Sequence, residues 1–125
     1  MRKMIVCISA VIGLALGSGS ALAASPILRV IVIQTTDLKA YIHEVDTLRA
    51  QFKKSGIPVT LRAWRARFAG TDAGAVVVSV EMPDLATLAK VDDAQKTNAE
   101  IAATMQRIGA LRKIVSDSLY EELSP

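Results

Sequence analysis

Residues 59–70, VTLRAWRARFAG, place three arginines and the only tryptophan of the chain in a stretch that is typical of a β-strand. Guanidinium groups bind carboxylates and phosphates, and an indole ring offers a flat apolar surface with one N–H donor. Three interpretations of the stretch are open: a nucleic-acid surface, a small-molecule site, or one strand of an ordinary sheet. Which one applies depends on the side chains that share a face with Trp64.

The next strand, residues 75–82, follows a turn-rich linker, and the two strands form a predicted hairpin. The predicted register has three cross-strand pairs on one face: Phe68–Ala75, Trp64–Ser79 and Arg62–Glu81. The other face is almost wholly apolar and is expected to lie under helices. The candidate ligand-pocket residues, with a tyrosine from the last strand, are Arg62, Trp64, Ser79, Glu81 and Tyr120. The alternatives are a simple ion pair for Arg62 with Glu81, and core or interface packing for Trp64.

Motifs for catalysis or metal binding are sparse. His43 is the only histidine, and it lies opposite the apolar side of its predicted helix, so we expect it to be solvated. Asp92 and Asp93 are predicted to form a solvated turn or cap between two helices. The serines of the last strand have no histidine partner, and no glycine-rich phosphate loop follows a strand. We therefore assign no catalytic residue and expect neither a metal nor a cofactor.

The first half of the chain predicts a strand and a helix. Residues 27–34, ILRVIVIQ, are apolar and β-branched almost throughout, which favours a central strand covered on both faces. From Leu38 the apolar side chains recur at helical spacing as far as Phe52. Two lysines and Gly56 then provide a C-terminal signal, and Pro58 prevents continuation.

The second half predicts two helices and a last strand. Asp84 can cap a short helix over LATLAKV, and Thr97 with Glu100 has the spacing of a capping box that would start a long helix. Residues 112–123 have the alternation of a fourth strand. The order β-α-β-β-α-β is the split βαβ pattern, and it predicts one α+β domain, residues 24–125. We expect a four-stranded antiparallel sheet with both helices on one face.

Residues 1–23, MRKMIVCISAVIGLALGSGSALA, have the pattern of a signal peptide, with a basic start, a short apolar run and an A-x-A end. The apolar run is shorter than the roughly 20 residues that span a bilayer. We expect cleavage after Ala23, a periplasmic or secreted protein, and no stable membrane insertion afterwards.

Removal of the leader changes the charge balance. The 15 basic residues fall to 13 because Arg2 and Lys3 leave, against 12 acidic residues, which gives a net charge of about +1. Nucleic-acid binding normally requires a clustered basic face, so we expect no nucleic-acid partner. Cys7 leaves as well, so a small domain without disulfides must be held together by its core or by a partner subunit.

The segments RAWRARFAGTDAGAVVVSVEMPDLATLAK and KIVSDSLYEEL follow a recognisable order: an Arg/Trp strand, a hairpin, a valine-rich strand ending in acid-x-Pro, a broken helical segment and a serine-containing last strand. In this the chain resembles the dimeric α/β barrel superfamily of ferredoxin-like domains, and within it small NIPSNAP-like and antibiotic-biosynthesis-monooxygenase-like domains. The resemblance implies a homodimer whose sheets pack face to face, and a pocket between sheet and helices. It implies no particular activity.

Two classes of function remain. The first is a non-enzymatic binding or interaction module, a dimer that takes a small apolar or aromatic molecule. The alternative is a cofactor-independent oxygenase or isomerase, which needs a group to transfer a proton, and the candidates are Glu81, Tyr120 and Tyr41. Because histidines and acid pairs are scarce, we favour the binding module.

Overall fold

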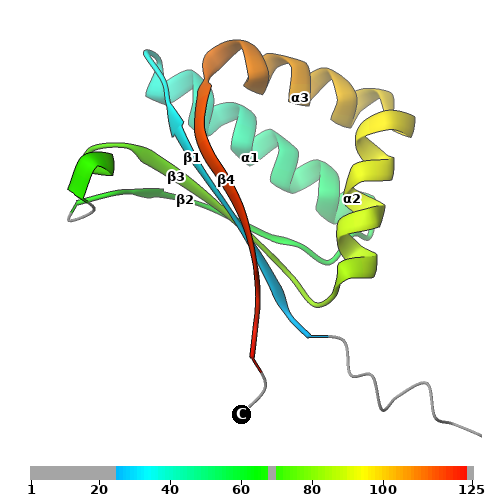
Figure 1. The fold of residues 1–125 in the computed structure, drawn as a ribbon. Helices are drawn as coiled ribbons and strands as arrows, with labels where there is room; N and C mark the ends of the chain where they lie inside the picture. The colour runs from blue at the N-terminus through cyan, green and yellow to red at the C-terminus, as the bar shows by residue number, and fades with distance from the viewer. Residues whose placement is uncertain (1–24, 68–69, 124–125) are drawn as a thin grey trace, which may run out of the picture.

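The computed structural model describes residues 25–67 and 70–123 (Figure 1). The predicted leader, residues 1–23, lies outside the described residues. Within the described part, no helix is both long and apolar enough to cross a membrane. In chain order the elements are β1 (Ile27–Gln34), α1 (Leu38–Lys54), β2 (Thr60–Arg65), a 3-10 turn (Gly70–Asp72), β3 (Val76–Met82), α2 (Leu85–Thr97), α3 (Ala99–Leu111) and β4 (Lys113–Glu121).

The four strands form one antiparallel sheet in the order β2-β3-β1-β4, and the three helices lie on one of its faces (Figure 1). This confirms the predicted α+β fold and its β-α-β-β-α-β order, with the second helical region split in two. The pairing of β1 with β4 contains a bulge: Val32 pairs with Ser116 and Ile33 with Ile114, so Val115 has no partner in the ladder.

Helix α1 forms where the sequence predicts it. The Asp37 side chain accepts a hydrogen bond from the Ala40 N–H at 3.0 Å and so caps the N-terminus. The apolar stripe is buried against the sheet, whereas His43 on the opposite side is exposed, as expected. Gly56 adopts a positive φ of 70° just beyond the helix, a conformation that glycine adopts without strain.

The second helical region corrects two predictions. Asp84 caps α2 as expected, but α2 continues to Thr97, so the exposed Asp92 and Asp93 lie inside a helix and not in a turn. Helix α3 is capped by Asn98 and not by Thr97. The Asn98 side chain accepts from the backbone N–H groups of two residues of the first turn at 3.1 and 3.2 Å.

The helix break explains why the capping box fails. The extended backbone of Asn98, with φ −96° and ψ 110°, both ends α2 and starts α3. Thr97 is still helical, and its hydroxyl donates to the carbonyl of Asp93 at 2.9 Å instead of capping α3. An asparagine at this junction outcompetes the threonine before it because only the residue with non-helical backbone can serve as the cap.

The hairpin register also differs from the prediction, by two residues. The observed pairs are Thr60–Glu81, Arg62–Ser79 and Trp64–Val77. The ladder closes where the Ala66 N–H donates to the Ala75 carbonyl at 2.9 Å, and Gly70 and Gly74 beyond it adopt positive φ. Phe68 lies outside the described residues. A two-residue shift keeps every side chain on its predicted face, because side chains alternate with a period of two.

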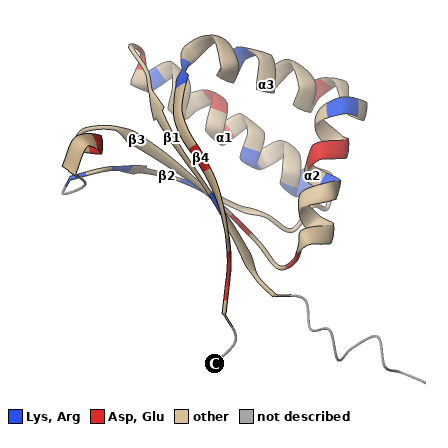
Figure 2. Cartoon of the chain, viewed as in Figure 1, with Lys and Arg blue, Asp and Glu red and all other residues tan. Residues whose placement is uncertain are grey.

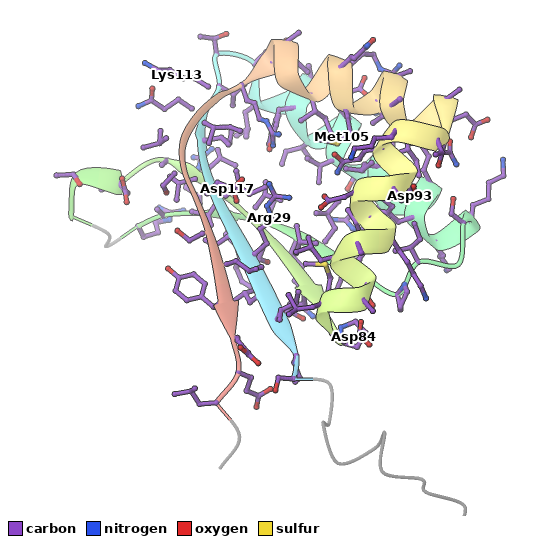
Figure 3. The ribbon with its side chains drawn as sticks, turned by 45° about the vertical axis from the view of Figure 1, so that its right-hand side comes forward. Arg29, Asp84, Asp93, Met105, Lys113 and Asp117 are labelled. Atoms are coloured by element: carbon purple, nitrogen blue, oxygen red, sulfur yellow. The ribbon has the colours of Figure 1, made fainter. Side chains whose placement is uncertain are left out.

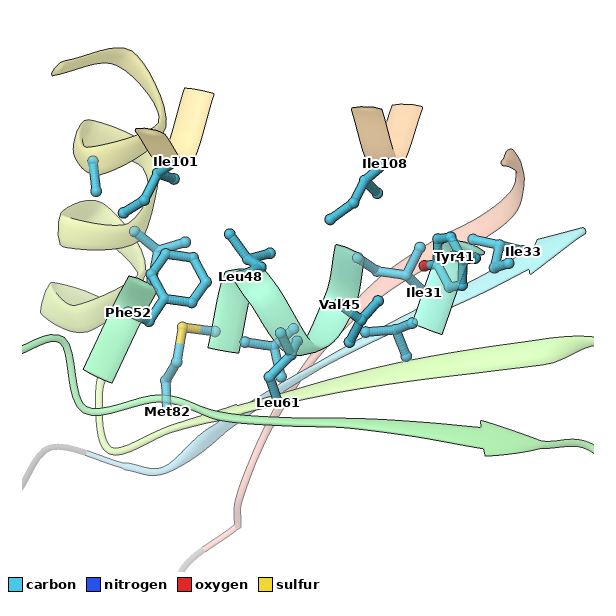
Figure 4. Close-up of a cluster of buried hydrophobic side chains, with 14 of the residues drawn as sticks. Ile31, Ile33, Tyr41, Val45, Leu48, Phe52, Leu61, Met82, Ile101 and Ile108 are labelled. Carbon is cyan, nitrogen blue, oxygen red and sulfur yellow. The ribbon is translucent and has the colours of Figure 1, made fainter. Parts of the chain in front are cut away.

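The hydrophobic core fills the layer between the sheet and the helices. In Figure 4, Phe52 of α1 lies between Met82 of β3 and Ile101 of α3, and all three are buried. Charged residues of both signs are interspersed along the described elements (Figure 2). The fold thus leaves one sheet face under helices and the other without a helical cover.

Candidate functional site

The five residues predicted for a ligand pocket all lie on the sheet face that no described helix covers, hereafter the open face. Its residues alternate with the helix-facing ones along all four strands. The Trp64 Nε1–H donates to the Ser79 hydroxyl at 2.8 Å, and Arg62 lies 3.8 Å from a carboxylate oxygen of Glu81. Both contacts are diagonal across the hairpin because of the two-residue shift in register.

These five residues do not converge on one chamber. Glu81 and Tyr120 line an open hollow of about 530 Å³ at the end of the sheet, whereas Trp64 lines a separate hollow of about 160 Å³ near Leu38. The side chains of Arg62 and Glu81 are each about half exposed, so their ion pair is a surface contact worth about 0–1 kcal/mol. The open face is therefore an extended contact surface and does not form an enclosed pocket around these five residues.

A cavity of about 210 Å³ lies on the other side of the sheet, between the strands and the helices. Side chains from β1, β2, β3 and all three helices line it, and most of them are apolar, such as Ile31, Leu48, Val78 and Ile108. This is where the resemblance to dimeric α/β barrels implies a pocket. We call it the sheet–helix cavity.

Tyr41 is the buried polar residue of this cavity. It belongs to the apolar stripe of α1, its side chain has 0% exposure, and Figure 4 shows its hydroxyl oxygen on the side toward Val45 and Ile31. Within the described residues, this hydroxyl has no hydrogen-bond partner. A buried donor without a partner costs about 1–3 kcal/mol, and native proteins rarely retain one without a reason.

Three other polar side chains line the cavity: Arg29 of β1, Gln95 of α2 and Arg112, which follows α3. Arg29 donates from Nε and Nη2 to the two carboxylate oxygens of Asp117, at 2.9 and 2.6 Å, beneath the helices (Figure 3). This hydrogen-bonded pairing lowers the pKa of the Asp117 carboxyl and raises the pKa of Arg29, and Arg112 lowers the pKa of Asp117 further. The pair is therefore a fixed, charged feature on β1 and β4.

The sequence predicts Tyr41 as part of a helical stripe and as a candidate for proton transfer, but it does not place Arg29, Gln95 or Arg112 at a site. One signal was present for Arg29. It is the only charged residue in ILRVIVIQ. Because side chains alternate along a strand, it shares a face with Ile27 and Ile31, which face the helices. No local pattern connects the other two to the cavity.

The chemistry that the cavity supports is limited. In residues 25–67 and 70–123, no group of three or more His, Cys, Asp or Glu side chains is placed to hold a metal ion. The carboxylate of Glu81, a predicted proton-transfer group, belongs to the open face on the other side of the sheet. The lining of the cavity provides apolar surface, one buried phenol, one carboxamide and two guanidinium groups.

No family model matches the chain, and no curated protein matches its sequence. Solved structures do match. A conserved protein of unknown function from Bacteroides thetaiotaomicron, described as a possible oxidoreductase, has a TM-score of 0.58 at 15% identity, over 80% of this chain and 100% of that one. A NIPSNAP family protein of unknown function from Agrobacterium tumefaciens has a TM-score of 0.56 at 12% identity, over 79% and 87%. The fold is ferredoxin-like.

A third ferredoxin-like neighbour is SnoaB, a cofactor-independent oxygenase from Streptomyces nogalater, with a TM-score of 0.51 at 14% identity, over 82% of this chain and 97% of that one. The predicted resemblance to NIPSNAP-like and monooxygenase-like domains is confirmed at the level of the fold. At these identities the likeness carries no activity, because one fold hosts many functions.

Proposed function

We propose that this protein binds a small, largely apolar molecule in the sheet–helix cavity. The observation that carries the proposal is the fully buried Tyr41, which belongs to the lining of this cavity and whose hydroxyl has no partner among the described residues. A bound molecule with a polar atom would supply the missing hydrogen bond. An apolar pocket with a few convergent polar groups is the usual form of a small-molecule site.

The size of the cavity restricts the ligand. An apolar cavity of about 150 Å³ is sufficient to bind benzene. The sheet–helix cavity has about 210 Å³, which suits a molecule of one ring or two fused rings. Residues such as Ile31, Leu48 and Val78 would bury its apolar surface, while Tyr41 would bind an oxygen or nitrogen of the ligand.

A cofactor-independent oxygenase or isomerase is the second candidate. It is favoured by the position of Tyr41, because a buried phenol in contact with a ligand could donate or accept a proton. The structural neighbour SnoaB is a cofactor-independent oxygenase, but it shares only 14% sequence identity with this chain. We place binding first because neither a carboxylate nor an imidazole lines the cavity beside Tyr41. Turnover of a bound aromatic in the presence of oxygen would establish the second candidate.

Replacing Tyr41 by phenylalanine should change stability and binding in opposite directions. Without ligand, the free energy of unfolding should rise by about 1–3 kcal/mol because the unpaired hydroxyl is gone. Affinity for 1-naphthol should fall by roughly 2- to 12-fold, the loss of one hydrogen bond worth about 0.5–1.5 kcal/mol. Urea denaturation and isothermal titration calorimetry measure the two effects.

The matched control is Tyr120→Phe, which removes the same hydroxyl from a half-exposed side chain on the open face. It should leave the affinity for 1-naphthol unchanged. Native mass spectrometry of the purified protein should also detect a co-purified small molecule in the wild type. If 1-naphthol and related one- and two-ring compounds fail to bind the wild type, the proposal is wrong.

We further propose that two copies of the chain pack through their open faces. The centre of this face is formed by small and apolar residues such as Val30, Val77 and Ser79, and the half-exposed Trp64 and Tyr120 stand at its two sides. An apolar centre with large aromatic side chains is characteristic of a protein interface. The ion pair of Arg62 with Glu81 balances charge on the same face, so two copies meet without net repulsion there.

Export is the third part of the proposal, and it rests on the sequence of residues 1–23. N-terminal sequencing of protein recovered from the periplasm or the medium should give a chain that starts at Ala24. A chain in the cytoplasm that keeps Met1 would contradict both the cleavage site and the location.

A further inference from the structure

We infer that the ligand of the sheet–helix cavity carries a carboxylate, which the guanidinium groups of Arg112 and Arg29 bind at the polar side of the cavity. The inference rests on the proposed function and names its chemical class: a carboxylic acid on a body of one ring or two fused rings. It follows from the charges that line the cavity, from the unused donors of Arg29, and from the unpaired state of Arg112.

The charged side chains that line the cavity have one sign. They are Arg29 and Arg112, and no carboxylate lines the cavity with them. Asp117 contacts Arg29 from β4 but is outside the lining, and Asp92, an exposed residue of α2, acts on Arg29 only through space. A ligand in the cavity therefore meets two guanidinium groups and no carboxylate in the lining.

Arg29 is held in place and still has donors available. Its ion pair with Asp117 uses Nε and Nη2, and no hydrogen bond within the described residues uses Nη1. Nη1 carries two N–H groups. The pair with Asp117 thus orients the guanidinium on β1, and its remaining edge can donate to an acceptor in the cavity. A donor that is already fixed loses little conformational entropy when it binds.

Arg112 is half-buried at the C-terminal end of α3, where its backbone is extended. Within residues 25–67 and 70–123, it makes neither an ion pair nor a side-chain hydrogen bond, unlike Arg107 five residues earlier, which pairs with Glu44. A partly buried arginine that lines an apolar cavity without a fixed partner is placed to bind an anion. Its planar fork matches the two oxygens of a carboxylate.

The ligand that satisfies all these groups has two parts. The apolar body fills the cavity against the core side chains, and its edge or a ring substituent meets the Tyr41 hydroxyl. The carboxylate lies where Arg112 and Arg29 line the cavity. Because Tyr41, Arg29 and Arg112 line one cavity of about 210 Å³, a single two-ring acid can contact all three.

The test compares 1-naphthoate with 1-naphthamide, its neutral counterpart of similar shape, by isothermal titration calorimetry on the purified protein. The wild type should bind 1-naphthoate at least about 10-fold more tightly, since a charge-assisted hydrogen bond is worth about 1.5–3 kcal/mol. Arg112→Gln should remove most of this preference and leave the affinity for 1-naphthamide within about twofold. We choose Arg112 over Arg29 because replacing Arg29 would strand Asp117 and could disturb folding.

Two variants control the result. Arg112→Lys keeps the charge without the fork, so it should retain part of the preference, and Arg67→Gln, at an exposed residue outside the cavity, should retain all of it. Equal affinities of the wild type for the acid and the amide would overturn the carboxylate inference. A preference for the acid that survives Arg112→Gln would overturn it too. Both results would leave the proposed binding function intact. If neither compound binds although 1-naphthol does, the inference alone fails, and if 1-naphthol fails as well, the proposed function fails with it.

Discussion

Replacing Trp64 by alanine should weaken the proposed self-association by roughly 30- to 700-fold, because truncating an interface tryptophan at a hot spot costs about 2–4 kcal/mol. The indole is 51% exposed in the single chain, although its N–H already donates to Ser79. The remaining exposed surface is apolar and rigidly held on β2, which makes it suitable for burial against a second copy. The effect on the stability of the single chain should be smaller.

Sedimentation velocity over a series of micromolar concentrations measures this effect directly. The wild type should sediment as a dimer, and Trp64→Ala should shift to the monomer at concentrations where the wild type remains associated. The melting temperature of the wild type should depend on protein concentration, and that of the monomeric variant should depend on it much less. Leu85→Ala is the control, because Leu85 is similarly exposed, at 58%, but lies at the start of α2 in the helical layer. A wild type that is monomeric throughout would exclude the proposed dimer.

Replacing Phe52 by alanine should lower the free energy of unfolding by about 3–5 kcal/mol, the usual range for truncating a buried phenylalanine. Phe52 is 3% exposed and belongs to the core between α1 and the sheet. It also lines the sheet–helix cavity, so removing the ring would enlarge a space that already exists. A small domain has about 5–15 kcal/mol in total, so this variant would lose between about a fifth and all of its stability.

Urea denaturation of the wild type and of Phe52→Ala gives the difference in their free energies of unfolding, from the midpoint and slope of each curve. The control is Lys53→Ala, the next residue of α1, which is exposed and should change stability by no more than about 0.5 kcal/mol. A loss below about 1 kcal/mol for Phe52→Ala would mean that α1 does not pack on the sheet through this stripe. The enlarged cavity should in addition accept a larger ring system, provided that the variant remains folded.

The sequence predicts those parts of the fold that are set by periodicity. The stripe of α1 and the alternation of the hairpin determine which side chains face the helices, and an error of two residues in register leaves those faces unchanged. The register itself depends on the loop, where Gly70 and Gly74 adopt positive φ, and periodicity does not specify loop geometry. The helix junction at Asn98 was likewise decided by backbone conformation, because two adjacent residues were both suitable caps.

The candidate site was less accessible from sequence. Arg62, Trp64, Ser79 and Glu81 could be grouped because they come from one hairpin, in which neighbours follow from local pairing. The polar groups of the cavity come from separate elements: Arg29 from β1, Gln95 from α2 and Arg112 from the end of α3. Their proximity is a product of the tertiary fold. Likewise, a tyrosine within an apolar stripe gives no indication that its hydroxyl will be unpaired.

The bulge at Val115 has a consequence for changes in chain length. On one side of it, Ser116 and the residues after it pair with β1 in a continuous ladder, which sets Asp117 opposite Ile31 and beside Arg29. On the other side, Ile114 pairs with Ile33 in a separate register. An insertion or deletion of one residue at this point would alter the bulge and leave the ladder from Ser116 onward in place. The short part of β4 before the bulge, Lys113 and Ile114, can therefore shift while the Arg29–Asp117 pair stays fixed.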